Sequence, residues 1–283
     1  MINSRAIYYM VISAICFTGI NSVVRFVDHL PVFELVFFRA IGTVICCLLI
    51  IRQKKIPIMG NNKKLLALRG VVGLISLTLF YKALQIMPMA SAVSLRYLSP
   101  FFAAGFAIYF LKEKMINIQW LFYFLAFCGV VLLKGFDSRI SMIALLIILV
   151  SAVFSGLVYV IIRKIGDSEH PVVIINYFLC ISTIVAGAIS IFNWVQPVGV
   201  EWVYLLAMGI FGFVAQYFMT KALQIEEANL ITPFKYSEVI FTLLVGWTLF
   251  GEGQSLIAVF AMILIVASLL ANVWTKQKYR TEQ

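Results

Sequence analysis

Two apolar stretches of the chain each contain a basic residue and a proline, and chemistry is expected at these points. Residues 89–111 include Arg96 and Pro100, and residues 228–250 include Pro233 and Lys235. A cation within an apolar membrane span costs about 2.5 to 3.5 kcal/mol unless it faces a partner or a water-filled cavity. Because proline has no N–H, it also frees a backbone carbonyl one turn earlier in a helix. The two stretches therefore predict broken helices whose cations line a cavity.

Two cations that face one cavity would favour an anionic group, such as a carboxylate or a phosphate. We therefore expect Arg96 and Lys235 to contact a substrate. Two alternatives stay open, because each cation could be neutralised by a nearby carboxylate or could extend its long side chain to a membrane interface. Lys235 and Glu238 in particular are spaced i,i+3, so they could pair on one helix face.

Other polar residues inside apolar segments are further candidates for substrate binding. Tyr97 and Tyr236 each follow one of the two cations. An aromatic ring beside a cavity can stack on a planar ligand or hold a cation, and packing in the core or against lipid is the alternative. The remaining candidates lie in other spans and are Asn21, Arg39, Tyr81 and Gln216. For Arg39, binding to a gate carboxylate or to a helix C-terminus is the alternative.

Four residues are candidates for coupling or gating, namely Glu34, Glu238, Pro100 and Pro233. A catalytic site would need converging acid, base or metal-binding groups. Both histidines and most carboxylates lie instead in predicted loops. No catalytic residue is therefore expected, and the chain is not expected to be an enzyme.

The composition is that of a polytopic membrane protein. Of the 283 residues, 63% are hydrophobic and only 12% are charged, which excludes an ordinary soluble protein. The net charge of +10 could suit a nucleic-acid partner, but the basic residues lie mostly between apolar segments and serve as topology signals. All five cysteines fall in apolar stretches without a CxxC motif, so neither a disulfide nor a metal site is expected. No cofactor is expected either.

The elements that must position these residues are transmembrane helices. A span needs about 20 apolar residues, and ten segments qualify: 6–27, 32–51, 66–86, 90–111, 117–134, 140–162, 172–193, 202–224, 228–250 and 255–275. Fifteen Lys and Arg residues, Arg69 among them, fall on one side of the predicted membrane and four on the other. The positive-inside rule then predicts that both termini are cytoplasmic. We expect the protein to lie in the cytoplasmic (inner) membrane.

The sequence contains an internal repeat. The pentapeptide KALQI occurs at 82–86 and at 221–225, an offset of 139 residues. The same offset aligns Gly70 with Gly209, Gly73 with Gly212, Arg96 with Lys235, Tyr97 with Tyr236, and Glu113 with Glu252. Two five-helix halves are therefore expected, residues 1–137 and 138–283. Because five is odd, the second half must enter from the opposite side, which predicts an inverted repeat. We expect the aligned glycines to allow close helix packing.

Several motifs resemble one known family. They are Phe37-Phe38-Arg39 in the second span, Tyr81-Lys82-Ala83-Leu84 at the end of the third, Pro100 with Phe110-Leu111-Lys112-Glu113-Lys114 at the exit of the fourth, and the second-half echo Leu249-Phe250-Gly251-Glu252. Together with the ten segments, they resemble the drug/metabolite transporter superfamily, EamA type.

The resemblance implies a secondary carrier in which two inverted five-helix repeats move a small organic solute by alternating access. The cations favour a solute with an anionic or zwitterionic group. Small multidrug-resistance relatives carry an acidic residue in the first span, whereas this chain has Asn21 there, which argues against proton-coupled drug efflux of that style. A carrier of lipid or lipid headgroups and a channel are the alternatives. The substrate, the direction of transport, the coupling ion and a possible homodimer are left open.

Overall fold

The computed structural model describes residues 4–111, 117–165, 168–225 and 234–281, and the regular structure in these ranges is helical. The helices are α1 (Ser4–Phe26), α2 (Val32–Lys54), α3 (Lys63–Ile86), α4 (Met89–Arg96), α5 (Ser99–Leu111), α6 (Asn117–Phe136), α7 (Met142–Ile165), α8 (Pro171–Ser190), α9 (Glu201–Ile225), α11 (Ser237–Phe250) and α12 (Leu256–Thr281). This confirms the all-α prediction.

Eight helical segments are long and apolar enough to cross a membrane, and α4 and α5 together form one of them. Two shorter apolar helices, Ser237–Phe250 and Leu256–Asn272, fall where the ninth and tenth spans are predicted. Most observed ends lie within a few residues of the predicted ones, although α12 continues to Thr281, six residues beyond the predicted end, and the first residues of the predicted ninth span lie outside the described ranges. For example, α3 begins three residues earlier than predicted, at Lys63, and α8 ends three residues earlier, at Ser190.

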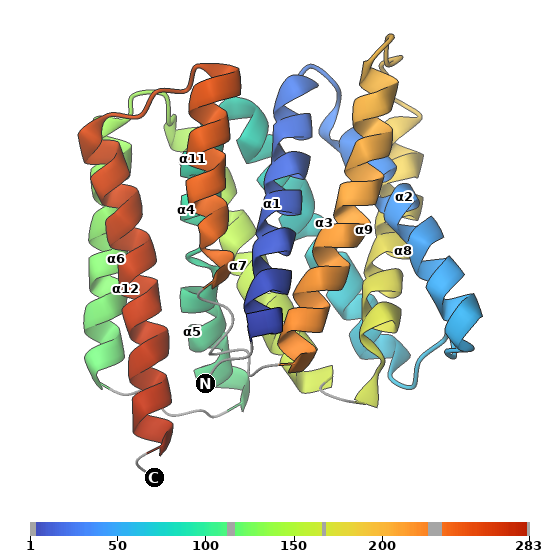
Figure 1. Ribbon diagram of the computed structural model, residues 1–283, viewed down its shortest axis with the longest axis horizontal. Helices are drawn as coiled ribbons and strands as arrows, with labels where there is room; N and C mark the ends of the chain where they lie inside the picture. Colours follow the sequence, from blue (N-terminus) through green and yellow to red (C-terminus); the bar gives the residue numbers. More distant parts are fainter. Residues whose placement is uncertain (1–3, 112–116, 166–167, 226–233, 282–283) are drawn as a thin grey trace.

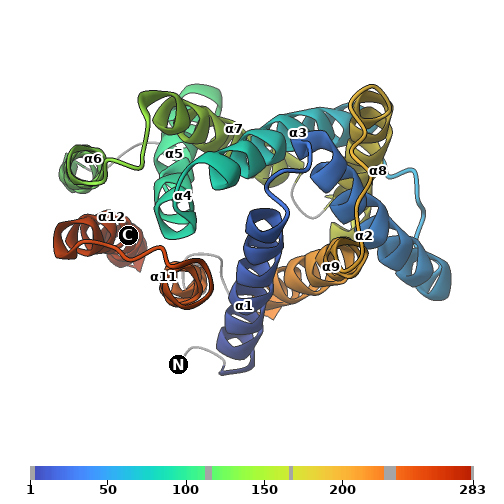
Figure 2. The same ribbon diagram turned by 90° about the horizontal axis from the view of Figure 1, so that it is seen from above.

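The helices run side by side in a single bundle, and the first turn of α1 lies at the same end as the last turn of α12 (Figure 1). Seen along the helix axes, α6 and α12 lie together at one edge of the molecule, and α2 and α8 lie at the opposite edge (Figure 2). Helices far apart in sequence pack in pairs: α1 with α9, α2 with α8 and α9, α3 with α7 and α8, and α6 with α12.

Small and hydroxylated residues bring these pairs into contact. A Cβ atom added to Gly42 in α2 would lie 2.7 Å from the Cα atom of Gly209 in α9, so the two backbones touch where the helices cross. In α3, the Ser76 hydroxyl lies 2.7 Å from that of Ser155 in α7. The Ser151 hydroxyl donates to the Ser76 carbonyl oxygen over 2.7 Å. Such close contacts and interhelical hydrogen bonds hold helices together where both lipid and protein are apolar.

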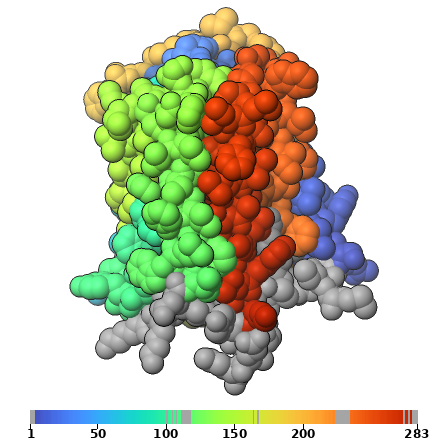
Figure 3. Space-filling model, turned by 90° about the vertical axis from the view of Figure 1, so that its left-hand side faces the viewer, coloured from blue at the N-terminus to red at the C-terminus, as the bar shows by residue number. Residues whose placement is uncertain are grey.

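The outer surface is apolar along the helices. The centre of the face shown in Figure 3 is formed by α6 (green) and α12 (red). The exposed side chains of these two helices include Trp120, Phe124, Phe127, Phe260 and Ile263. Soluble proteins rarely expose a continuous apolar surface of this kind. The same side chains would contact acyl chains in a bilayer.

Two helix interruptions occur where the sequence predicts them. In the first, α4 ends at Arg96, Tyr97 and Leu98 form a turn, and α5 begins at Ser99. Pro100 is therefore the second residue of α5, a position where a backbone N–H has no helical partner to lose. In the second, Tyr236 forms a turn between helical Lys235 and the start of α11. Pro233 lies outside the described residues.

Candidate functional site

A cavity of about 130 Å³ lies inside the bundle, at the two helix interruptions. Residues from α1, α2, α3, α4, α7, α8 and α9 line it, together with residues of both interruptions. Seven of the residues predicted to bind substrate or to gate lie on its wall: Asn21, Arg39, Arg96, Tyr97, Gln216, Lys235 and Glu238. The structure thus brings together side chains that are up to 217 positions apart in sequence.

The wall of the cavity is strongly basic. Four of the described lining residues are cations, Arg39, Arg69, Arg96 and Lys235, whereas Glu238 is the one lining carboxylate among them. Two charges 4 Å apart interact with about 4 kcal/mol at an effective dielectric constant of 20, against about 1 kcal/mol in water. The empty cavity therefore holds an excess of positive charge, and its low dielectric constant strengthens the interaction of this charge with a ligand.

Each of the four cations lies over an aromatic ring. The distances from the charged atom to the ring centroid are 3.9 Å for Arg96 over Phe80, 4.2 Å for Arg69 over Phe178, 5.1 Å for Lys235 over Phe17 and 5.5 Å for Arg39 over Tyr81. A ring face attracts a cation but does not cancel its charge. The rings hold the cations in place and leave their charge available to a ligand.

Within the described ranges, the ion pairs lie away from these cations. They are formed by Arg25 with Asp28 and Glu252, by His29 with Glu201, and by Arg139 with Asp137. The i,i+3 pair of Lys235 with Glu238, which the sequence allowed, is not among them.

Glu238 is bound by neutral groups instead. Its Oε1 accepts a hydrogen bond from Asn21 Nδ2 over 3.0 Å, and its Oε2 accepts one from the Tyr97 hydroxyl over 2.8 Å. The carboxylate lies in the first turn of α11, where the helix dipole favours a negative charge.

Tyr97 connects the two interruptions. Besides Glu238, its hydroxyl oxygen lies 3.0 Å from the carbonyl oxygen of Lys235, which is a second acceptor for the same proton. Its ring packs edge-on against Tyr236 with a centroid distance of 4.7 Å. Tyr236, a predicted substrate contact, is 4% exposed and is not among the residues that line the cavity.

Tyr81 and Arg39 are hydrogen-bonded to each other. Arg39 Nη1 donates to the Tyr81 hydroxyl over 2.9 Å, and Tyr81 is fully buried. Tyr81, a predicted substrate contact, is therefore placed behind the wall of the cavity, where it orients Arg39.

Gln216 lines two cavities. One is the central cavity, and the other, of about 50 Å³, lies between α2, α8 and α9 and is also lined by Lys54, His170 and Lys221. Burial, and then the positive charges of Lys54 and Lys221, lower the pKa of His170, so this histidine is neutral at pH 7. The second cavity continues the basic lining toward the end of the bundle that holds the C-terminal ends of α2 and α9.

Arg69 corrects the sequence interpretation, which counted it among the basic loop residues. Because α3 begins at Lys63, Arg69 lies nearly two turns inside the helix, where it is 8% exposed and lines the cavity. Its Nε and Nη1 atoms have no hydrogen-bond partner among the described residues. A Cβ on Gly73 would lie 2.6 Å from Arg69 Nη1, so this glycine makes room for the guanidinium as well as for a neighbouring helix.

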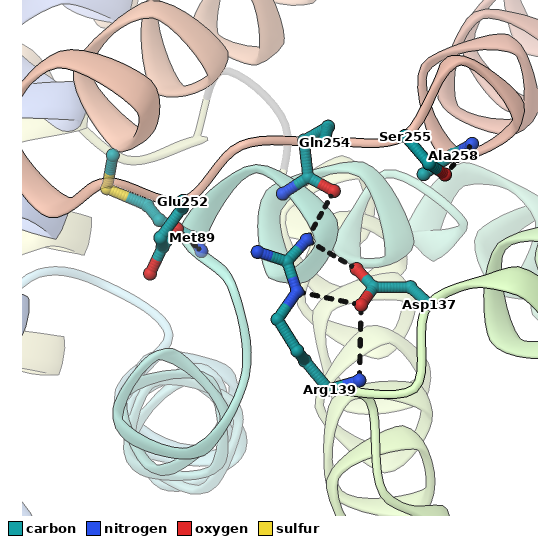
Figure 4. A network of polar contacts seen from close by, with 7 residues as sticks. All are labelled: Met89, Asp137, Arg139, Glu252, Gln254, Ser255 and Ala258. Carbon is teal, nitrogen blue, oxygen red and sulfur yellow. Dashed lines mark hydrogen bonds and ion pairs between the residues drawn. The ribbon is translucent and has the colours of Figure 1, made fainter.

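Glu252 lies in the connection between α11 and α12, at the end of the bundle opposite the termini (Figure 1), where it joins several elements. Figure 4 shows its surroundings from close by. Its Oε1 forms an ion pair with Arg25 Nε at 3.0 Å, and its Oε2 accepts from the backbone N–H of Met89 over 2.8 Å. It thereby links α1, the start of α4 and the connection between α11 and α12. Beside it, Arg139 binds Asp137 and donates to Gln254 Oε1 over 2.9 Å.

Glu34, predicted to couple or gate, lies at this same end and not on the central cavity. It is fully buried at the start of α2 and accepts a hydrogen bond from Val195 N over 3.2 Å. This hydrogen bond links α2 to the loop before α9. Glu252, which the sequence offered only as part of a repeated motif, forms the more extensive contact.

A bundle of apolar helices around a charged internal cavity defines an integral membrane protein that transports small molecules. The chain belongs to the EamA-like transporter family, which matches residues 4–134 and 142–274. This family has a ten-helix transporter fold, so the chain is a transporter and not an enzyme.

Known relatives differ in what they carry and in which direction. The pseudopaline exporter CntI of Pseudomonas aeruginosa is 31% identical over 94% of this chain and 95% of the relative. The S-adenosylmethionine uptake transporter of Rickettsia prowazekii is 22% identical over 87% of this chain and 84% of the relative. Human solute carrier family 35 member G1 is 28% identical over 93% of this chain and 77% of its own length. A solved crystal structure with 19% identity covers 99% of both chains with a TM-score of 0.72, and it supports the fold alone.

Proposed function

We propose that this protein is a secondary active carrier that moves a small organic solute with an anionic or zwitterionic group by alternating access. One observation carries the proposal. Arg96 and Lys235 lie at the two helix interruptions and line the same cavity, each over an aromatic ring, and neither takes part in an ion pair within the described ranges. Charges inside a membrane protein that lack a protein partner mark a substrate path.

An anionic group on the solute would supply the counter-charge that the cavity lacks. Hydrogen bonds between a guanidinium and a carboxylate or phosphate are charge-assisted and about twice as strong as neutral ones. Glu238 keeps acceptor capacity beyond its bonds to Asn21 and Tyr97, because a carboxylate has about four acceptor sites. A solute ammonium group could use these sites, which makes a zwitterion a suitable ligand.

Alternating access is supported by the difference between the two ends of the bundle. At one end, Glu252 ties Arg25 to the N-terminus of α4. Toward the other end, the small basic cavity beside Gln216 extends the lining. We propose that the first end is the outer one and is closed in this conformation, that both termini are cytoplasmic in the inner membrane, and that the halves 1–137 and 138–283 move against each other.

The proposal is tested first by ligand binding. Purified protein is screened by thermal unfolding against a panel of anionic and zwitterionic metabolites, because a ligand that binds only the folded state raises the apparent stability. We expect at least one such compound to raise the midpoint of the wild type. Arg96→Ala should abolish that shift while the protein stays monodisperse in size-exclusion chromatography. Arg96→Ala protein that binds as well as wild type would refute the proposed site.

A further inference from the structure

We infer that the cavity contains a second anion-binding subsite, formed by Arg69 and Arg39, and that the transported solute therefore carries at least two anionic groups. This inference rests on the proposed function and adds to it. The first subsite is the one at Arg96 and Lys235. The second lies on α2 and α3, opposite a different set of rings.

Arg69 has the burial, position and free hydrogen-bond donors expected of a residue that binds a ligand. It is more than nine-tenths buried, lies on the cavity wall, and has two nitrogen atoms without a hydrogen-bond partner among the described residues. A buried donor that stays unsatisfied is costly, and more so when it is charged. Phe178 lies under the guanidinium at 4.2 Å and Gly73 leaves the space in which it sits. The guanidinium is thus oriented and left with hydrogen-bonding capacity.

Arg39 completes the subsite. Its Nη1 donates to Tyr81, which fixes the side chain, and the guanidinium keeps its remaining donors for other partners.

The two subsites differ in their relation to the sequence repeat. The 139-residue offset aligns Arg96 with Lys235, so both halves supply a cation to the first subsite. The same offset aligns Arg39 with Phe178 and Arg69 with Met208, so the second half has no cation at either position. Arg39 and Arg69 are therefore not part of the repeated pattern. Their presence on the cavity wall is explained if they bind the solute.

Charge balance leads to the same class of solute. Four lining cations face one lining carboxylate in the described part of the wall. A solute with a single negative charge would leave a net excess of two positive charges, whereas a dicarboxylate, a tricarboxylate or a phosphorylated carboxylate would bring the cavity close to neutral. Like charges in low-dielectric surroundings repel strongly, so the more anionic solute should bind better.

The test compares small anions that differ in the number of carboxylates. Purified wild-type protein is titrated with lactate, glutarate and citrate at constant ionic strength, and the dissociation constant is taken from the shift in thermal unfolding. We expect citrate and glutarate to bind at least about tenfold more tightly than lactate, the ratio that one added charge-assisted hydrogen bond gives.

Two variants of the subsite and one control then locate the effect. Arg69→Gln should remove most of the preference for citrate over lactate and leave lactate binding within about twofold. Gly73→Ala keeps the charge but displaces the guanidinium, and it should reduce the same preference. Lys64→Gln removes one positive charge from an exposed position of the same helix and should change neither constant.

The outcomes separate this inference from the proposed function. Equal binding of citrate and lactate by wild type, or an unchanged preference in Arg69→Gln, would overturn the second subsite and leave the carrier and its Arg96 contact in place. If citrate binding is lost equally in Lys64→Gln, the effect is general electrostatic attraction and the subsite is also refuted. If none of these anions binds to wild type, both the subsite and the proposed anionic substrate are contradicted.

Discussion

At the scale of single residues, the main feature of this protein is a group of buried cations held by aromatic rings. Arg69 shows the cost to folding stability most clearly, because two of its nitrogen atoms are buried without a hydrogen-bond partner among the described residues. Binding sites often sacrifice stability in this way, since groups arranged for a ligand are unsatisfied when the ligand is absent. The energetic burden of the empty cavity is the expected signature of a binding site.

Replacing Arg69 should therefore stabilise the empty protein. Gln is uncharged and shorter, so Arg69→Gln removes an unpaired buried charge, and we expect a gain of about 1 to 3 kcal/mol in the free energy of unfolding. The measurement is unfolding of the purified protein in detergent without added ligand. Lys64→Gln is the control and should stay within about 0.5 kcal/mol of wild type. A loss of stability in Arg69→Gln would mean that the guanidinium has a structural partner.

Seven residues of the cavity wall could be predicted from the sequence because they are polar residues inside apolar spans. Arg96, Lys235, Asn21 and Gln216 are of this kind. Arg69 could not be recognised as a cavity residue because it follows Lys63 and Lys64 closely. A cluster of basic residues at the edge of a predicted span is typical of a loop. The glycine four residues later was the available signal, since Gly73 marks the position that the guanidinium needs.

At the scale of helices, the interruptions at Tyr97 and Tyr236 create the site. The first interruption could be predicted from Pro100, because proline is tolerated in the first turn of a helix but not further inside one. The sequence could not show that the two interruptions touch. That contact depends on Tyr97 reaching Glu238 and the backbone of Lys235, across 141 and 138 positions of the chain.

The crossing of α2 and α9 gives a direct test of helix packing. Gly42→Ala would place a Cβ atom 2.7 Å from a backbone atom of Gly209, so the helices would have to separate. We expect a loss of about 1 to 3 kcal/mol in the free energy of unfolding, as for other overpacked sites. Gly105→Ala on α5, where a Cβ meets nothing within 4 Å, is the control and should be neutral or slightly stabilising. Equal effects of the two changes would show that this crossing is not tight.

At the scale of the whole molecule, helices of the first half pack against helices of the second, and the cavity lies between them. The sequence repeat predicted two halves but not which helices would pair, because α1 with α9 and α6 with α12 follow from three-dimensional packing. Nor did it predict that Glu252, which is not among the residues that line the cavity, would tie α1 and α4 together at one end.

Weakening this tie should open the proposed outer end. In Glu252→Gln the ion pair with Arg25 is lost while the size of the side chain is kept. Val93, on the cavity wall, is replaced by Cys, and its labelling by a membrane-impermeant thiol reagent is followed from the outer side. We expect labelling to be about fivefold faster or more, because about 1 kcal/mol changes a population ratio by that factor.

Asp28→Asn provides the matched control for this experiment. It removes the more exposed and more distant partner of Arg25, at 3.7 Å, and should have little effect on labelling. Protein without the introduced cysteine reports any background from the five native thiols. Labelling that is unchanged in Glu252→Gln, or equally increased in Asp28→Asn, would argue against a closed outer end held by Glu252.

Counterflow in proteoliposomes tests the carrier itself. Vesicles containing purified protein are loaded with the unlabelled solute found by the thermal-unfolding screen, and uptake of labelled solute is measured from outside. A carrier with a central cationic site should show saturable uptake that is stimulated by internal solute, and Arg96→Gln should lose it while Lys64→Gln retains it. Unsaturable uptake without such stimulation, as in a channel, or wild-type counterflow by Arg96→Gln would contradict the account.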